Sequence, residues 1–372
     1  MQEIATPLQL LFDIVLWLAV VLLLWPAYNP PHTITKTKRR IGYLLLLLFC
    51  LFPFWGGDYF HYKDEFYDVL NGGYPHVEPV YQWVMFNLSF ESYLLFRLII
   101  WGGALLLLLK AYSRSSSNFD ECILLFAACY LPLFSYARVS LSISLIILGL
   151  SFVVSDRGYR SIVSVFFGLT IIGCSEFFHR SAIIGIAAAI ASLFLMNAKK
   201  GTIFLVIIIL PLAVYLIGFA LQYISDLDLD NDMFVSSQLI NTYLDSTKRG
   251  TIGGGLGEVL MILLARIPLY LSAILYLKLV INGSYSSFTI AERVLSSFAF
   301  CCILLGALFL IDFGFNTNVF HYRTLNLALP ANAVFLAAVY KHNFNRVFCG
   351  VVLWTTVIGV LYSLSYSLYC AI

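Results

Sequence analysis

The sequence carries little charge: only 11% of its 372 residues are Asp, Glu, Lys or Arg. A soluble domain carries roughly twice that share, so a soluble globular enzyme is excluded. Instead, 61% of the residues are hydrophobic and the mean hydropathy is +0.89. Many apolar runs approach the ~20 residues that cross a bilayer. The composition predicts an all-α, polytopic integral membrane protein.

The sequence also lacks the cysteine patterns of metal sites and disulfide frameworks. Its 8 cysteines fall almost entirely within apolar runs, and neither a CxxC nor a Cys/His ligand spacing occurs. This placement is typical of buried thiols. The acidic stretch from Asp226 to Asp232 contains a DxD pattern, which we interpret as a solvated loop, with weak cation binding as the alternative. We therefore expect neither a metal nor a cofactor.

Apolar segments follow one another along the whole chain. About twelve candidate spans can be drawn, at 8–28, 41–55, 94–109, 119–137, 139–155, 161–178, 181–196, 202–222, 259–280, 294–313, 324–340 and 347–369. The two long polar segments between them, 56–93 and 222–258, are predicted outer loops. Since no soluble domain or linker is visible, residues 1–372 are expected to form a single membrane domain.

Basic residues divide the loops into two sets. One set of alternate loops holds fourteen of the 22 Lys and Arg residues: Lys36, Lys38, Arg39, Arg40, Lys110, Arg114, Arg157, Arg160, Lys199, Lys200, Lys278, Arg293, Lys341 and Arg346. Because cytoplasmic loops are enriched in Lys and Arg, this set is predicted to be cytoplasmic. The opposite set contains both long polar segments and is then external or periplasmic, together with both chain ends.

Five arginines run against this bias, at or just inside the outer ends of the predicted spans. They are Arg97, Arg138, Arg180, Arg266 and Arg323. Snorkelling, or pairing with loop carboxylates, can explain any one of them. Five together favour an anionic ligand, because guanidinium groups bind phosphate bidentately. We expect at least two of them to hold such a ligand.

The first outer loop begins with GGDYFHYKDEFYD, residues 56–68. Asp58 lies at the predicted membrane edge, where partial desolvation would make its carboxylate a stronger general base. Aromatic faces such as those of Tyr59 and Tyr62 pack on sugar rings. The alternative for these tyrosines is an interfacial aromatic belt.

A second polar motif, CSEFFHRSAIIG, places three functional groups at the outer end of a span: Glu176, His179 and Arg180. Glu176 and His179 are three residues apart and are predicted to share one helical face. A carboxylate there can orient the imidazole and determine which nitrogen is available. The alternative is a structural histidine.

A later motif, FHYRTLN, offers Tyr322 and Arg323 as part of a phosphate clamp or as a turn held by local pairing.

Four motifs occur in order along the predicted outer side: Asp58 with Tyr62, Glu-Pro-x-Tyr from Glu78 to Tyr81, Arg138 heading a helix, and FHRSA at 178–182. Together they resemble the EpsG-like family, which is similar to the Wzy-type polymerases of O-antigen and exopolysaccharide. The resemblance is good from Trp55 to about Leu195, and further on rests on the pattern of spans. Val139 and Ser140 depart from the Gln and Ala that many members carry there.

The resemblance implies a GT-C-like, metal-independent membrane glycosyltransferase with two long outer loops. It would move a growing glycan from one undecaprenyl pyrophosphate carrier to the non-reducing end of another carrier-linked repeat unit, on the periplasmic face of a bacterial inner membrane. The expected partners are the carrier-linked oligosaccharide, a chain-length regulator protein and the lipid bilayer, with no nucleic acid.

The residues suit this transfer in three roles. We expect Arg138, Arg180, Arg266 and Arg323 to clamp the pyrophosphate, with Arg97 as a further candidate. Asp58 is the leading candidate for the base and His179 the second. The candidates for binding the glycan are Tyr59, Tyr62, Glu78, Tyr81, Glu176 and Tyr322.

Other functions for such a protein stay open. A lipid-linked oligosaccharide flippase or transporter would place charges near the bilayer midplane, whereas Asp13 is the only acid well within a predicted span. An O-antigen-ligase-type glycosyltransferase would use the same donor with a different acceptor. A membrane acyltransferase would need a histidine–acid pair on the cytoplasmic side, and none is predicted there.

Overall fold

The structure of the chain is a computed structural model. It describes residues 5–25, 34–54, 58–73, 78–116, 118–136, 139–155, 158–179, 182–197, 199, 201–209, 212, 256–308, 317–342, 344 and 346–371. Within these ranges the chain is almost entirely helical, which agrees with the predicted all-α class.

The first half of the chain alternates long helices with short helical pieces. The elements are α1 (Pro7–Leu24), α2 (Lys36–Leu51), α3 (Asp58–Leu70), α4 (Pro79–Asn87), α5 (Tyr93–Arg97), the π-helical turn η3 (Leu98–Gly102), α6 (Gly103–Ser115), α7 (Phe119–Cys129), α8 (Leu131–Tyr136) and α9 (Val139–Val153). The segments α5, η3 and α6 follow one another directly, so 93–115 is one continuous helical stretch with a π-bulge in it.

The second half begins with a two-residue-per-strand hairpin. The elements are β1 (Val154–Ser155), β2 (Gly158–Tyr159), α10 (Ile162–Cys174), the 3₁₀ turn η4 (Ser175–Phe177), α11 (Ala182–Leu195), α14 (Leu256–Ile281), the 3₁₀ turn η6 (Ser284–Ser287), α15 (Ile290–Leu308), α16 (Thr317–Lys341) and α17 (Arg346–Ala371). Residues 201–209 are also helical. The strands are antiparallel, with Val154 opposite Tyr159.

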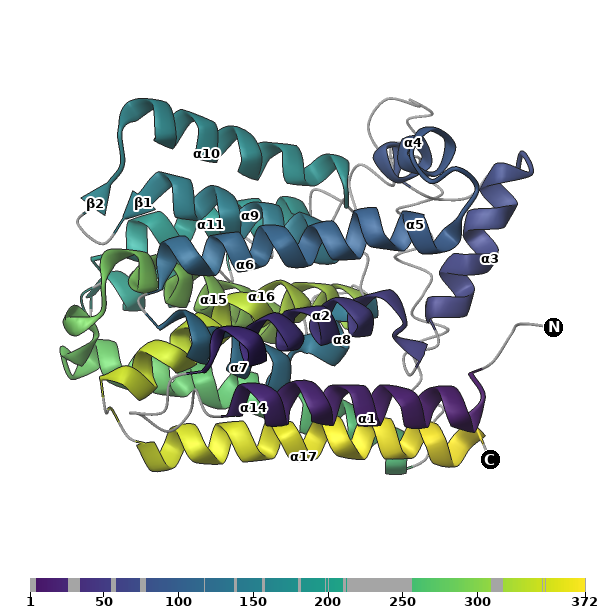
Figure 1. Cartoon of the computed structure of the whole chain (residues 1–372). Coiled ribbons are helices and arrows are strands. Elements are labelled where there is room, and N and C mark those ends of the chain that lie inside the picture. Colours follow the sequence, from purple (N-terminus) through teal and green to yellow (C-terminus); the bar gives the residue numbers. More distant parts are fainter. Residues whose placement is uncertain are drawn as a thin grey trace.

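The long helices run side by side as a bundle (Figure 1). Both α3 and α4 lie at one end, which we call the α3–α4 end, and α1 begins and α17 ends on that side. The hairpin lies at the opposite end, which we call the hairpin end. Among the closest pairs are α15 with α16, α9 with α10, and α14 with α17.

Local sequence signals start several helices. Thr6 and Gln9 form a capping box at α1, with Pro7 at the first helical position. Thr35 caps α2 so that the helix already begins at Lys36, five residues before the predicted span. Ser161 caps α10 in the same way.

Buried polar contacts connect distant helices. The Trp17 indole N–H donates to the carbonyl of Ala127 at 2.8 Å and thereby joins α1 to α7. The Asn332 amide on α16 lies 2.5 Å from the Tyr130 hydroxyl and 3.1 Å from the Ser272 hydroxyl. Inside a bilayer such bonds satisfy polar groups that lipid cannot.

The helices in the described part of the chain are consistent with membrane insertion. Three are long and apolar enough to cross a bilayer: Pro7–Leu24, Tyr93–Ser115 and Ile290–Leu308. Val139–Val153, Ile162–Phe177, Ala182–Leu195 and Gly350–Tyr362 are apolar but shorter. The expectation of about twelve spans and that of a GT-C-like fold therefore both stay predictions.

The segment 56–93, expected to be an outer loop, contains more regular structure than its composition suggested, and its placement on the outer side stays a prediction. Most of this segment is helical, because α3 and α4 lie within it. Helix α3 ends shortly before Gly72, which adopts a φ of 85° that residues with a Cβ rarely adopt. Of the second predicted loop, 222–258, only the first residues of α14 lie within the described part of the chain.

Candidate functional site

Two of the predicted motifs meet at the α3–α4 end through an acid and a histidine. Nε2 of His179 lies 3.9 Å from Oε1 of Glu78, and the two side chains are 9% and 12% exposed. This distance is too long for a hydrogen bond, but it allows an ion pair when the imidazole carries a proton. A proton taken up by His179 therefore lies beside a carboxylate.

The backbone around both residues explains why they face each other. Glu78 precedes Pro79, which begins α4. The N–H of His179 donates to the Glu176 carbonyl at 3.2 Å, and the His179 carbonyl accepts from the N–H of Ala182 at 2.8 Å. His179 is thus held in the short connection between η4 and α11.

The predicted pairing of Glu176 with His179 is replaced in the structure by this longer-range pair. Residues Ser175–Phe177 form a 3₁₀ turn, in which the side-chain positions differ from those of an α-helix. Glu176 is exposed. Next to the acid–histidine pair, the rings of Tyr81 and Phe178 pack edge to face with centroids 6.5 Å apart.

A buried guanidinium lies at the same end of the bundle. Arg97 is 0% exposed. Its Nη2 donates to the carbonyls of Cys50 at 2.6 Å and Ser135 at 2.9 Å. These carbonyls belong to the last turns of α2 and α8, where backbone acceptors have no partner within their helix. Arg97 therefore joins the ends of two helices.

Aromatic rings complete the surroundings of this guanidinium. Its carbon Cζ lies 4.1 Å from the ring centroid of Trp101 and 5.2 Å from that of Tyr59, and Nη1 lies 3.4 Å from the Tyr93 hydroxyl. Within the described part of the chain, no carboxylate forms an ion pair with Arg97. Because the side chain is fully buried, a positioning role is favoured over direct contact with a pyrophosphate.

The tyrosines expected to bind a glycan pack mainly against the protein. Tyr81 is 1% exposed. Tyr59 and Tyr62 are half-buried, and the Tyr62 ring lies against Trp101 with centroids 5.8 Å apart. The backbone carbonyl of Tyr59 accepts a hydrogen bond from the Tyr93 hydroxyl at 2.9 Å. Tyr59 and Tyr62 thus pack around Arg97 and Trp101.

Arg266 lies deeper than the sequence suggested. Its helix α14 begins at Leu256, so Arg266 follows ten residues later, about 15 Å along the axis. It is half-buried, and its charge acts on Tyr270 one turn further on. Arg266 thus lies within α14 and not in its first turn.

The other predicted site residues lie partly or wholly outside the described part of the chain. Arg138 and Arg180 lie outside the described residues. For Asp58, Tyr322 and Arg323 only the backbone is described, at the start of α3 and in α16. Asp58 directly precedes Tyr59, and Arg138 follows Ser135 by three positions, so both flank residues that contact Arg97.

A comparison with family models decides the identity of the chain. The model of the EpsG family matches residues 37–371. The chain belongs to the EpsG family. This is the family of exopolysaccharide and O-antigen polymerase-like proteins. No curated protein and no solved structure matches the chain.

The EpsG match confirms the resemblance noted in the sequence and extends it. It begins within α2 and runs to the end of α17, and so includes both members of the Glu78–His179 pair. The family and the apolar helices together indicate a membrane-integral, polymerase-like protein.

The partners of Arg97 were missed by the sequence reasoning, although a signal was present. Tyr93, Arg97 and Trp101 are spaced by four residues each and thus lie on one helical face. The carbonyls of Cys50 and Ser135 carry no such signal, because any residue can supply a backbone acceptor.

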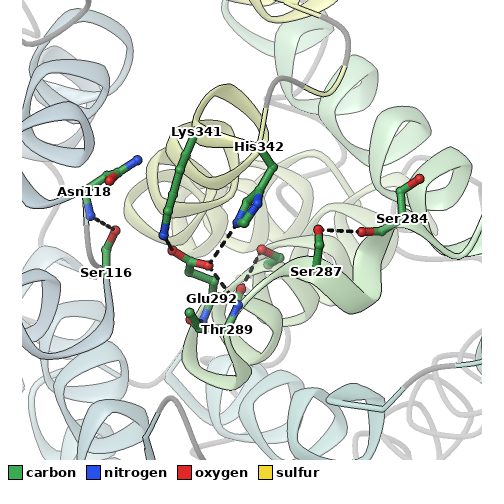
Figure 2. A network of polar contacts seen from close by, with 9 residues as sticks. Ser116, Asn118, Ser284, Ser287, Thr289, Glu292, Lys341 and His342 are labelled. Carbon is green, nitrogen blue, oxygen red and sulfur yellow. Dashed lines mark hydrogen bonds and ion pairs between the residues drawn. The ribbon is translucent and has the colours of Figure 1, made fainter. Parts of the chain in front are cut away.

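A second polar cluster lies at the hairpin end. The Glu292 carboxylate is fully buried, and Figure 2 shows Lys341 and His342 reaching toward it from the end of α16. Lys341 Nζ lies 3.8 Å from Oε1, and His342 Nε2 lies 4.0 Å from Oε2. Thr289 and Glu292 also form a capping box, because each backbone N–H donates to the other side chain. The cluster joins α15 to α16.

Proposed function

We propose that this EpsG-family protein is a polysaccharide polymerase. It transfers a growing glycan from undecaprenyl pyrophosphate to the non-reducing end of another carrier-linked repeat unit, on the periplasmic face of a bacterial inner membrane. The observation that supports this most is the meeting of Glu78 and His179, which come from two separate motifs of the family resemblance.

The transfer needs one base. The acceptor sugar hydroxyl attacks the anomeric carbon of the donor glycan, and the bond from that carbon to the pyrophosphate oxygen breaks with its electron pair on the oxygen. The hydroxyl proton passes to the base. His179 suits this role because Glu78 stabilises the positive charge that the imidazole acquires. Asp58, at the start of α3, is the other candidate.

The transfer also needs positive charge at the leaving group. Arginine side chains can take up the charge that develops on the pyrophosphate, so the proposed mechanism requires no metal. Arg138, Arg180, Arg266 and Arg323 are the proposed clamp. Arg97 acts indirectly, by holding the ends of α2 and α8 from which Asp58 and Arg138 follow. A chain-length regulator protein is a proposed partner.

A polymerisation assay with purified carrier-linked repeat unit tests the base. His179→Ala should lower the rate about 10²- to 10⁴-fold, and Glu78→Gln should lower it less. His61→Ala is the matched control, because His61 is an exposed histidine on α3 at the same end of the bundle. Asp64→Asn is the control for Asp58→Asn. Full activity of both His179→Ala and Asp58→Asn would overturn the assignment.

Banding of the surface polysaccharide on a gel distinguishes the proposed polymerase from a ligase and from a flippase. Loss of a polymerase leaves a single repeat unit on the final acceptor. Loss of an O-antigen-type ligase or of a flippase leaves none, and that result would reject the polymerase.

A further inference from the structure

A pair of arginines at the hairpin end is not part of the site described above. Arg114 lies in the last turn of α6, and Arg160 directly follows β2. Both reach the C-terminal end of α9. The guanidinium of Arg114 stacks on the Phe152 ring, with Cζ 3.9 Å from its centroid. Nε of Arg160 donates to the carbonyls of Ser151 at 3.2 Å and Val154 at 3.0 Å.

Because Arg114 stacks on Phe152 and Arg160 binds the carbonyls of Ser151 and Val154, both positive charges lie at the same end of α9, where they repel each other. In the described residues no carboxylate pairs with either group, and the buried Nε of Arg114 has no hydrogen-bond partner. Two cations held together without an anion are costly at a membrane surface. A bound phosphate would remove that cost, because it accepts hydrogen bonds from both forks.

The Phe152 ring under Arg114 is itself packed against a second aromatic ring. Phe152 packs edge to face on Phe167 of α10, with centroids 5.0 Å apart. Since stacking uses only the face of the guanidinium, its N–H groups stay available for oxygen acceptors.

The surface beside the pair is strongly apolar. Helix α10 begins two residues after Arg160, and its first turns expose Ile162 by 88%, Val163 by 79% and Phe166 by 73%. Such a face suits acyl chains. The site thus combines a phosphate-binding pair with a lipid-facing helix, as in basic pockets that bind lipid head groups between membrane helices.

We propose that Arg114 and Arg160 bind the phosphate of an anionic lipid head group at the hairpin end. The site is separate from the proposed glycan transfer and does not depend on it. The bound lipid joins α6, the end of α9 and the start of α10. This is a structural lipid site in the leaflet opposite the α3–α4 end.

Native mass spectrometry of the full chain in neutral detergent tests the site, with phosphatidylglycerol and phosphatidylcholine of the same acyl chains as probes. The wild type should retain phosphatidylglycerol preferentially. Arg114→Gln should weaken this preference about fivefold, and the double change with Arg160→Gln should weaken it about twenty-five-fold, which is a factor of about five for each basic group. Lys110→Gln, an exposed position one turn earlier on α6, is the matched control and should bind as the wild type does.

Arg114→Gln alone decides the outcome if the double variant fails to fold, because Arg160 also caps α9. Equal binding by the wild type and Arg114→Gln, or equal retention of the two lipids by the wild type, overturns the proposal. Inorganic phosphate identifies the source of the anion. If inorganic phosphate at millimolar concentration does not displace phosphatidylglycerol, the result supports a lipid ligand. If inorganic phosphate displaces the lipid fully, the result overturns the lipid proposal in favour of free phosphate.

Discussion

The two ends of the bundle each bury a charge, but of opposite sign. At the α3–α4 end, Arg97 is held by the carbonyls that end α2 and α8 and by aromatic rings. At the hairpin end, the Glu292 carboxylate is held by the N–H of Thr289, just before α15, and by two basic side chains. Helix C-termini carry partial negative charge and N-termini partial positive charge, so each buried ion meets a helix end of opposite sign.

The difference lies in the counter-charge. Glu292 has Lys341 and His342 beside it, so the hairpin-end cluster is nearly neutral. Such a cluster suits a structural role in which it connects α15 to α16. Arg97 has no carboxylate partner in the described residues, so its positive charge persists. This buried positive charge is balanced only by backbone carbonyls and aromatic rings, so it depends on how α2, α5 and α8 pack together.

The largest effect is expected from Arg97→Met, which keeps the volume but removes the donors. Two buried carbonyls lose their partners, so the free energy of unfolding should fall by on the order of 3 kcal/mol or more. The apparent Tm in detergent, followed by tryptophan fluorescence at one scan rate, measures this. Lys110→Met is the exposed control. A fall no larger than that of the control would mean that Arg97 does not hold the two helix ends together.

Glu292→Ala should have the next largest effect, because it removes one half of the capping box of α15 and the buried carboxylate beside Lys341. We expect a loss of about 2 kcal/mol. Glu292→Gln should lose less, since its amide oxygen still accepts from the Thr289 N–H. The same unfolding measurement compares the two, and equal losses would contradict a capping role.

Tyr93→Phe removes one hydroxyl that contacts Arg97 and donates to the Tyr59 carbonyl. The expected cost is about 1 kcal/mol, because the change removes the 2.9 Å hydrogen bond to the Tyr59 carbonyl and the longer, weaker one from Arg97 at 3.4 Å. Tyr67→Phe on the exposed face of α3 is the control. An unchanged apparent Tm for Tyr93→Phe would show that the rings, and not the hydroxyl, support Arg97.

The smallest effect is a pH dependence at the hairpin end. Burial lowers the pKa of His342 from its ordinary value of 6.5, Glu292 opposes this and Lys341 adds to it. As the pH falls, His342 therefore takes up its proton in the unfolded chain before it does so in the folded protein. Its contribution to the free energy of unfolding is fully present above about pH 6.5 and is lost as the pH falls toward the lower pKa of the folded state. Apparent Tm values at about pH 7.5 and about pH 5.5 should differ more for the wild type than for His342→Gln. Identical differences would exclude His342 as the titrating group.

Much of the fold could be predicted from local patterns. Apolar runs located the helices, and Thr6, Thr35 and Ser161 mark where three of them begin. Helices α3 and α4 were missed, because their many charged and aromatic residues resemble the composition of a loop and obscure the helical period. In the site, the sequence predicted the motifs that contain Glu78 and His179. It predicted Glu176 as the carboxylate beside His179, whereas the structure places Glu78 there.

The sequence by itself determined the membrane-helical class, the EpsG family and the segregation of basic residues, because hydropathy, helix caps and motif order are properties of neighbouring residues. Only the tertiary structure decided that Glu78 faces His179 across about a hundred residues of chain, and that Arg97 binds carbonyls from two other helices. Partners so far apart in sequence are chosen by how helices pack and where they end, and no local pattern encodes that choice.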